Sequence, residues 1–331
     1  MKTIKSSLIC LLLIFFVNSI NAQNHQLKFN SNKKFKIVQF TDLHIKYQDK
    51  RSDIAFVKMN EVLIAEKPDL ILITGDIIYS KPAKKNLRNV LDFISKYKIP
   101  FAVTFGNHDR EQGLSNDKLF KIVKSYPYNV TIDEQPQING AGNCALVLKS
   151  SKGKAAAVLY LIDSNSYSKI KGVKGYDFIH NDQVNWYMDK SREFTANNNG
   201  KPLFSLAFFH IPLPEFKQAI MNQNSSMYGI RREAVCAPKL NSGMFAAFKE
   251  CGDVKGVFVG HDHDNDFAIN WQGVLLAYGR YSGGNTVYNN IPNGARIIEL
   301  TQNSSSFKSW IRTSDTNVEQ ITTFPNDYIK K

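Results

Sequence analysis

One pattern is repeated three times in the first third of the chain: an apolar segment that ends in a short polar loop. The segments at residues 35–40, 70–74 and 101–104 have the apolar character of β-strands. Residues 53–66 and 86–97, which separate them, are predicted to form helices. This order predicts a βαβαβ unit, in which polar residues that follow the strands gather at one edge of a sheet.

The rest of the chain supplies more short strands than helices. Strands are predicted at residues 144–148, 156–163, 203–209, 254–259, 266–271, 274–278, 295–300 and 307–311, and a helix at residues 181–193. No repeat, low-complexity tract or linker interrupts this course. We therefore predict a single α/β (α+β-like) domain over residues 23–331, with two packed β-sheets flanked by helices.

Side chains suited to metal binding are concentrated just after the predicted strands. Five of the chain's seven histidines lie in these loops. The strand ends provide Asp42, His44, Asp76, Asn107, His108, His210, His261 and His263. Taken singly, a loop histidine is more often a structural hydrogen-bonding group, and a loop aspartate is more often a turn or cap residue. Five strand ends that each supply an oxygen or nitrogen donor instead favour a transition-metal site.

The same loops carry a motif series that resembles a known family, the calcineurin-like metallophosphoesterases. In chain order the blocks are Asp42-Leu43-His44, Gly75-Asp76, Gly106-Asn107-His108-Asp109, His210 and Gly260-His261-Asp262-His263. The third and fifth blocks together are specific. Residues 161–164, 183–186, 229–243 and 278–284 also resemble a purple-acid-phosphatase-like subset of this family. The resemblance covers most of the chain and implies a four-layer sandwich with two mixed β-sheets.

The resemblance also implies two metal sites that share one carboxylate. Asp42, His44, Asp76 and His263 would hold one ion, and Asp76, Asn107, His210 and His261 the other. Two cations about 3.5–4 Å apart can share a hydroxide that attacks phosphorus in line. The amide of Asn107 would provide a neutral oxygen where an anionic substrate must sit. Histidine and carboxylate ligands are compatible with divalent or trivalent iron, manganese or zinc, so the metals are not identified.

Four further residues receive roles from the motifs. The resemblance implies that His108 faces the leaving oxygen, oriented by Asp109, as a general acid or an electrostatic support. A capping or packing role is the alternative for His108. Arg110 and Arg280 are candidate phosphate contacts, because guanidinium groups pair with phosphate oxygens in bidentate fashion. Surface salt bridges are the alternative for both arginines.

Residues 75–79 also resemble the Gly-Asp-x-x-Tyr signature of purple acid phosphatases. In those enzymes the tyrosine binds ferric iron, and a glycine stands where this chain has His44. Because His44 is available to that metal, we predict that Tyr79 packs against the site or supports a ligand.

Together these features predict a hydrolase that cleaves phosphate monoesters by attack of a metal-bridging hydroxide. A phosphodiesterase, a nuclease or a nucleotide hydrolase on the same dimetal site is the alternative within this mechanism. A catalytically silent metal-binding scaffold is the alternative from another class.

The N-terminus predicts export. Lys2 and Lys5 precede an apolar run at residues 8–17 and a small-residue stretch that ends at Ala22, which is the pattern of a signal peptide over residues 1–22. We expect a periplasmic or secreted protein after cleavage near Ala22; an uncleaved anchor is the alternative, although the run is shorter than the roughly 20 residues of a membrane span. Thus no stable membrane anchor is predicted.

The net charge favours an anionic partner without identifying it. The formal charge is +13, and the basic residues are scattered along the chain. We expect a phosphorylated small-molecule substrate and no dedicated nucleic-acid surface. The oligomeric state stays open. Cys144, Cys236 and Cys251 can form at most one disulfide, for which Cys236–Cys251 is the favoured pair.

Overall fold

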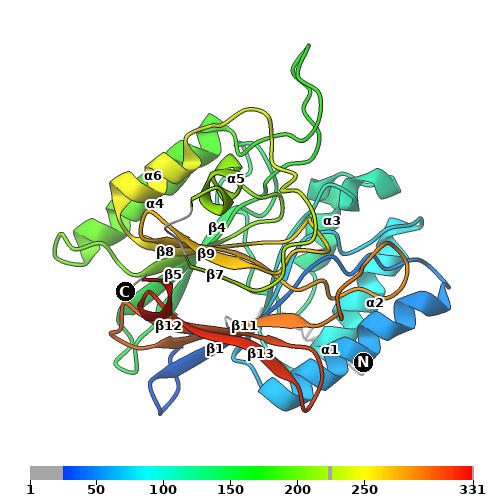
Figure 1. Cartoon of the computed structure of the whole chain (residues 1–331), viewed down its shortest axis with the longest axis horizontal. Coiled ribbons are helices and arrows are strands. Elements are labelled where there is room, and N and C mark those ends of the chain that lie inside the picture. Colours follow the sequence, from blue (N-terminus) through cyan, green and yellow to red (C-terminus); the bar gives the residue numbers. More distant parts are fainter. Residues whose placement is uncertain (1–24, 223–225, 330–331) are drawn as a thin grey trace, which may run out of the picture.

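Two β-sheets pack face to face in the computed structural model, which describes residues 25–222 and 226–329 (Figure 1). The six-stranded sheet has the order β13-β12-β11-β1-β2-β3, and the seven-stranded sheet the order β4-β5-β6-β8-β10-β9-β7. The signal peptide predicted for residues 1–22 lies outside the described residues. Within the described part, no helix is both long and apolar enough to span a membrane.

The strands of the six-stranded sheet are β1 (Lys34–Phe40), β2 (Leu70–Thr74), β3 (Phe101–Thr104), β11 (Ala295–Thr301), β12 (Phe307–Arg312) and β13 (Val318–Phe324). β1, β2 and β3 run parallel, and β11 and β12 extend the sheet from β1 in antiparallel pairing. The strands of the other sheet are β4 (Cys144–Lys149), β5 (Ala155–Leu161), β6 (Ser205–Phe208), β7 (Met227–Tyr228), β8 (Val254–Val259), β9 (Ala268–Trp271) and β10 (Val274–Tyr278). Here β5, β6, β8 and β10 form a parallel centre with antiparallel edges.

Helices cover the outer face of each sheet. The six-stranded sheet is covered by α1 (Asp53–Glu66), α2 (Ala83–Ser95) and α3 (Asn116–Val123), and the other sheet by α4 (Asn181–Asn197), α5 (Pro214–Ile220) and α6 (Met244–Cys251). The result is a helix–sheet–sheet–helix sandwich. The predicted fold class and the predicted βαβαβ unit are therefore confirmed.

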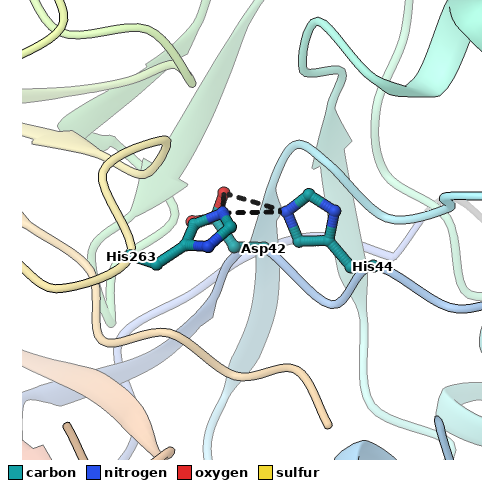
Figure 2. A group of neighbouring side chains, drawn as sticks. All are labelled: Asp42, His44 and His263. Atoms are coloured by element: carbon teal, nitrogen blue, oxygen red, sulfur yellow. Dashed lines mark hydrogen bonds and ion pairs between the residues drawn. The ribbon is translucent and has the colours of Figure 1, made fainter. Parts of the chain in front are cut away.

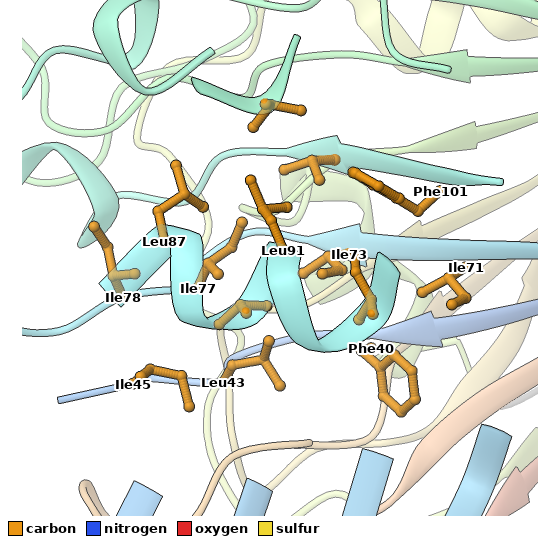
Figure 3. Packing of buried hydrophobic residues seen from close by; sticks show 14 of the residues in the cluster. Phe40, Leu43, Ile45, Ile71, Ile73, Ile77, Ile78, Leu87, Leu91 and Phe101 are labelled. Carbon is orange, nitrogen blue, oxygen red and sulfur yellow. The ribbon is translucent and has the colours of Figure 1, made fainter. Parts of the chain in front are cut away.

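Strand β2 shows how the apolar sequence requires this layering. All five of its residues are buried. Ile71 and Ile73 point into the cluster under the helices, whereas Leu70 and Leu72 point into the core between the sheets. Figure 3 shows Leu87 and Leu91 of α2 packed over the isoleucines of this cluster. Each such side chain contributes about 1.5–3 kcal/mol when fully buried, so both faces of β2 anchor the loop that follows it.

Several elements were not predicted. Helices α3, α5 and α6 and strand β13 are absent from the sequence-based prediction, and α2 begins three residues before the predicted start at residue 86. The cysteines Cys144, Cys236 and Cys251 are all free thiols, so the favoured bridge between Cys236 and Cys251 is not formed.

Candidate dimetal site

The carboxyl ends of β1, β2, β3, β6 and β8 meet at one edge of the sandwich and bring the predicted ligands together. The buried side chains form two groups, and within each group the potential ligand atoms all lie within 4.8 Å of one another. One group is Asp42, His44 and His263, and the other is Asp76, His210 and His261. Six of the seven predicted ligands are thus divided between the two groups.

In the first group two imidazoles and a carboxylate face a common point (Figure 2). The Nε2 atoms of His44 and His263 are 3.0 Å apart. They lie 3.9 Å and 3.8 Å from Oδ1 of Asp42, respectively. Imidazole lone pairs and a carboxylate oxygen that converge in this way match the ligand set of a divalent transition metal.

The second group adjoins the first through Asp76. Oδ2 of Asp76 lies 3.1 Å from Nε2 of His210 and 3.7 Å from Nε2 of His44. Nδ1 of His261 lies 3.3 Å from the same His210 nitrogen. Since one carboxylate oxygen stands between residues of both groups, Asp76 has the position required of a bridging ligand.

Asn107, the seventh predicted ligand, has a buried neutral side-chain oxygen. Its side-chain Nδ2 donates to the hydroxyl of Tyr167 at 3.2 Å, which fixes the orientation of the amide. Oδ1 of Asn107 is buried and has no hydrogen-bond partner among the described residues. A buried, unpaired oxygen is costly unless something satisfies it, and a cation would do so. The residues present therefore fit two metal ions.

Backbone carbonyls set the tautomers of two histidines. Nδ1 of His210 donates to the carbonyl of Thr74 at 2.8 Å, and Nδ1 of His263 donates to the carbonyl of Tyr288 at 3.0 Å. A carbonyl accepts only, so Nδ1 must carry a hydrogen, which leaves Nε2 as the atom of each neutral ring that can bind a metal ion. The sequence gives no sign of these two carbonyl contacts.

The loops that hold the ligands are backbone-strained. Asp42, His44, Asp76 and His261 have φ values of 56°, 45°, 49° and 83°, in the left-handed region that is uncommon for residues other than glycine, although Asp and His adopt it more often than most. Each conformation costs about 1–3 kcal/mol and persists only where the surroundings impose it. Strain at four of the seven predicted ligands indicates that these turns serve the site rather than the stability of the fold.

The charges of the site offset one another. Burial lowers the pKa of His44 and of His261 well below its ordinary value, so both imidazoles are neutral. Burial alone would also lower the pKa of His210, but the charge of Asp76 and the hydrogen bond to it raise this pKa to about 10. Burial would raise the pKa of Asp76, yet the charge of His210 holds it well below the usual range. A positive charge therefore accompanies the Asp76 carboxylate, in the proton of His210 or in a bound cation.

The predicted contact between Asp109 and His108 is wrong. Oδ1 of Asp109 accepts from the backbone N–H groups of Ile77 and Ile78 at 2.8 Å and 3.0 Å, and Oδ2 accepts from that of Gly106 at 2.8 Å. Asp109 thus joins the loop after β3 to the loop of Asp76. Both of its carboxylate oxygens accept from backbone N–H groups, and its side chain makes no hydrogen bond to the imidazole.

His108 is instead bound by Glu111, which the sequence analysis did not single out. Nδ1 of His108 lies 2.7 Å from Oε2 of Glu111, while the backbone N–H of His108 donates to Oδ1 of Asp76 at 2.8 Å. The His108 side chain is 26% exposed, so it stands at the open side of the buried groups. The only signal in the sequence was the three-residue spacing, which a short 3-10 helix (Asp109–Gln112) turns into a contact.

The aromatic ring of Tyr79 packs edge-on against two imidazoles. Its centroid lies 5.0 Å from that of His44 and 4.7 Å from that of His108. This is the packing arrangement predicted for Tyr79.

The two predicted phosphate contacts, Arg280 and Arg110, differ in whether their guanidinium groups are already bound to other residues. Arg280 is fully buried, and its guanidinium binds Asp266, Glu319 and the carbonyl of Pro292. No nitrogen of this side chain is left for a substrate, so the phosphate contact predicted for Arg280 is wrong. Arg110 lies in the 3-10 helix beside His108, partly buried and with Nε unpaired among the described residues. Its contact with phosphate stays a prediction.

Comparisons with known proteins agree with this geometry. The family model "Calcineurin-like phosphoesterase" matches residues 35–265, which confirms the resemblance drawn from the motifs. "Probable inactive purple acid phosphatase 29" from Arabidopsis thaliana is 32% identical over 91% of this chain and 87% of its own length. "Phosphatase DCR2" from Saccharomyces cerevisiae is 31% identical over 84% of this chain and 54% of its own length. The structure of a dimetal phosphatase from Danio rerio shares the fold, with a TM-score of 0.60 and 12% identity over 87% of this chain and 98% of that one.

Proposed function

Because the chain belongs to the calcineurin-like phosphoesterase family, we propose that it hydrolyses phosphate monoesters at a centre of two metal ions. The observation that carries this proposal is the position of the Asp76 carboxylate, one oxygen of which lies 3.1 Å from His210 and 3.7 Å from His44. A single shared carboxylate between two adjoining ligand groups is the arrangement that two-metal hydrolysis requires.

The chain's own residues prepare this site before any substrate enters. When bound, two cations would lower the pKa of a water molecule and balance charge on the phosphoryl oxygens. Asp76 is held from the other side by the backbone N–H of His108, so its second oxygen is free to face both groups. Asn107 presents a neutral oxygen, oriented by Tyr167, which avoids additional repulsion of an anionic ester.

His108 is the residue placed to act on the leaving group. Its ring is the most exposed of the site imidazoles, and its Nδ1 is engaged by Glu111. Nε2 is therefore the atom that can give a proton to the leaving oxygen as the P–O bond breaks. General acid catalysis of this kind contributes about 10²–10⁴-fold to the rate.

The chief competing function is a metal-binding scaffold without turnover. There is a specific reason to consider this alternative, because the name of the Arabidopsis relative contains the words "probable inactive". Against it stands the full set of seven ligand-type residues, six of which lie in the two buried groups. A scaffold would also have no need for an exposed His108 beside those groups.

Hydrolysis assays with matched variants test the proposal. Protein reconstituted with manganese, zinc or iron is expected to hydrolyse 4-nitrophenyl phosphate faster than bis(4-nitrophenyl) phosphate. His210→Ala is expected to lose one ion and nearly all turnover. His180→Asn, which changes a histidine at the start of α4 and keeps a capping side chain, is the control and is expected to retain activity. Equal hydrolysis by the wild type and His210→Ala would refute the dimetal mechanism, and faster cleavage of the bis-ester would favour a diesterase.

We also propose that the protein acts after export on a small phosphorylated molecule. The N-terminal pattern and the formal charge of +13 support this. A mature N-terminus at Gln23 in the exported fraction is the expected result. An intact Met1 in protein that stays in the cytoplasm would contradict it.

A further inference from the structure

Four side chains beside the ligand groups form one continuous hydrogen-bonded chain. Nδ2 of Asn107 donates to the Tyr167 hydroxyl at 3.2 Å, and that hydroxyl donates to Oε1 of Glu111 at 2.7 Å. The other oxygen of Glu111 lies 2.7 Å from Nδ1 of His108. A ligand residue is thereby joined to the imidazole that faces the leaving group, and Glu111 is the only carboxylate in the chain of contacts.

The directions of these hydrogen bonds follow from donor chemistry. The Asn107 Nδ2 is a donor only, so the Tyr167 oxygen accepts and its hydrogen goes to Glu111. A carboxylate accepts only, so Nδ1 of His108 must carry a hydrogen. The ring of His108 is then fixed with Nε2 toward the open side.

The two middle members of this chain, Glu111 and Tyr167, lie in structured segments. Glu111 lies in the 3-10 helix Asp109–Gln112, which ends at Gly113 in a left-handed turn. Tyr167 begins a loop that Tyr176 closes through a β-bridge, and the two rings stack with centroids 5.7 Å apart. The ring of Tyr176 in turn packs edge-on against the imidazole of His261, with the ring centroids 4.3 Å apart. Ligands Asn107 and His261 are therefore both tied to the loop that carries Tyr167.

We propose that Glu111 is a positioning residue that holds His108 in its working orientation and, through Tyr167, couples it to the ligand Asn107. The proposal rests on the proposed phosphoesterase function. Glu111 touches neither substrate nor the reacting atoms, and it exchanges no proton in the reaction. Since its side chain is 36% exposed, its effect comes from the geometry of two short hydrogen bonds rather than from its charge.

Substrates with different leaving groups separate positioning from general stabilisation. 2,4-Dinitrophenolate leaves without protonation, whereas phenolate requires a proton. Glu111→Gln is expected to lower kcat for phenyl phosphate about 10- to 100-fold, the usual effect of losing an outer hydrogen-bond partner, with KM unchanged. For 2,4-dinitrophenyl phosphate its kcat is expected to stay near the wild-type value. Tyr167→Phe is expected to give a smaller loss with the same dependence on the leaving group.

Matched controls make these results decisive. Glu193→Gln removes another exposed glutamate, paired with Lys190 at the same three-residue spacing, and is expected to leave both substrates unaffected. His108→Ala is expected to reproduce the leaving-group dependence, and adding Glu111→Gln to it is expected to have no further effect. A loss by Glu111→Gln that is equal for both esters, or additive with His108→Ala, would overturn the positioning role.

A second measurement needs neither metal nor turnover. In ¹⁵N-labelled, metal-free protein, the His108 ring is expected to show a hydrogen on Nδ1 that Glu111→Gln displaces. An unchanged ring spectrum in that variant would overturn the proposal. If the wild type hydrolysed neither ester while the spectrum changed as expected, the proposed function would fail and the positioning contact would stand.

Discussion

A single added methyl group at Gly106 is expected to dismantle the metal site while leaving the fold intact. A Cβ at this position would lie 2.1 Å from Oδ1 of Asp76, 2.5 Å from its backbone nitrogen and 2.7 Å from its Cγ. Real Cβ contacts are essentially never shorter than 3.0 Å. Because Gly106 does not have a positive φ, the backbone accepts alanine and the clash with Asp76 is the whole perturbation.

The size of the effect follows from these distances. Asp76 or the loop after β3 must move by about 1 Å, since 2.1 Å must become a distance of at least 3.0 Å. A displacement of that size at a reacting centre lowers the rate about 10²-fold. Overpacking of this kind also destabilises the fold by about 1–3 kcal/mol. We therefore expect Gly106→Ala to fold with a slightly lower Tm, to bind less metal and to lose about 99% of kcat.

Gly256→Ala is the matched control for this variant. The three atoms nearest to a Cβ there belong to hydrocarbon side chains, at 3.0 Å for Phe258 and 3.1 Å for Leu206 and Phe307, and none is a predicted ligand. Metal content by inductively coupled plasma spectrometry, Tm by calorimetry and kcat on 4-nitrophenyl phosphate are compared for both variants. Two bound ions and wild-type kcat in Gly106→Ala would refute the argument that Asp76 is held in place by this contact.

Three other perturbations test separate parts of the structure. Burial would raise the pKa of Glu66, but hydrogen bonds from Trp310 and Arg312 outweigh it and hold the pKa below its usual range. Glu66→Gln is therefore expected to lower the free energy of unfolding by about 2 kcal/mol at pH 7, as measured by denaturant unfolding. That stabilisation is present above about pH 4.3 and disappears as the pH falls through the folded-state pKa of Glu66. If the wild type and Glu66→Gln differed in unfolding free energy by the same amount down to about pH 2, this reasoning would be contradicted. Arg280→Ala leaves the buried carboxylate of Asp266 without its ion-pair partner and is expected to cost about 3–5 kcal/mol, with KM unchanged in folded protein; a raised KM would restore Arg280 as a phosphate contact. Chelation of the metals is expected to abolish turnover and lower Tm, and added manganese, zinc or iron to restore both; full activity after verified metal removal would exclude metal-dependent hydrolysis.

The predictable part of the site depends on the strands buried on both faces. The run at residues 70–73 is apolar and all five residues of β2 are buried, and the turn after such a strand must lie at the sheet edge. Asp76 could therefore be assigned to the same edge as His210 without any knowledge of the structure. The ligand types follow from metal chemistry, which tolerates few substitutes at these positions.

Contacts made across the fold could not be predicted in this way. Arg280 looked available for phosphate because its partners, Asp266 and Glu319, lie 14 and 39 residues away in sequence. The family resemblance implied that Asp109 orients His108, yet a 3-10 turn directs Asp109 to the backbone and brings Glu111 to the ring instead. Local backbone geometry decides such cases, and sequence pattern carries little information about it.

The central claim is that one oxygen of Asp76 is shared between two metal ions. A crystal structure of the metal-loaded protein, with anomalous scattering to locate the ions, tests it most directly. We expect two ions, with Asp76 among the ligands of both. A single ion, or two ions neither of which touches Asp76, would contradict the claim.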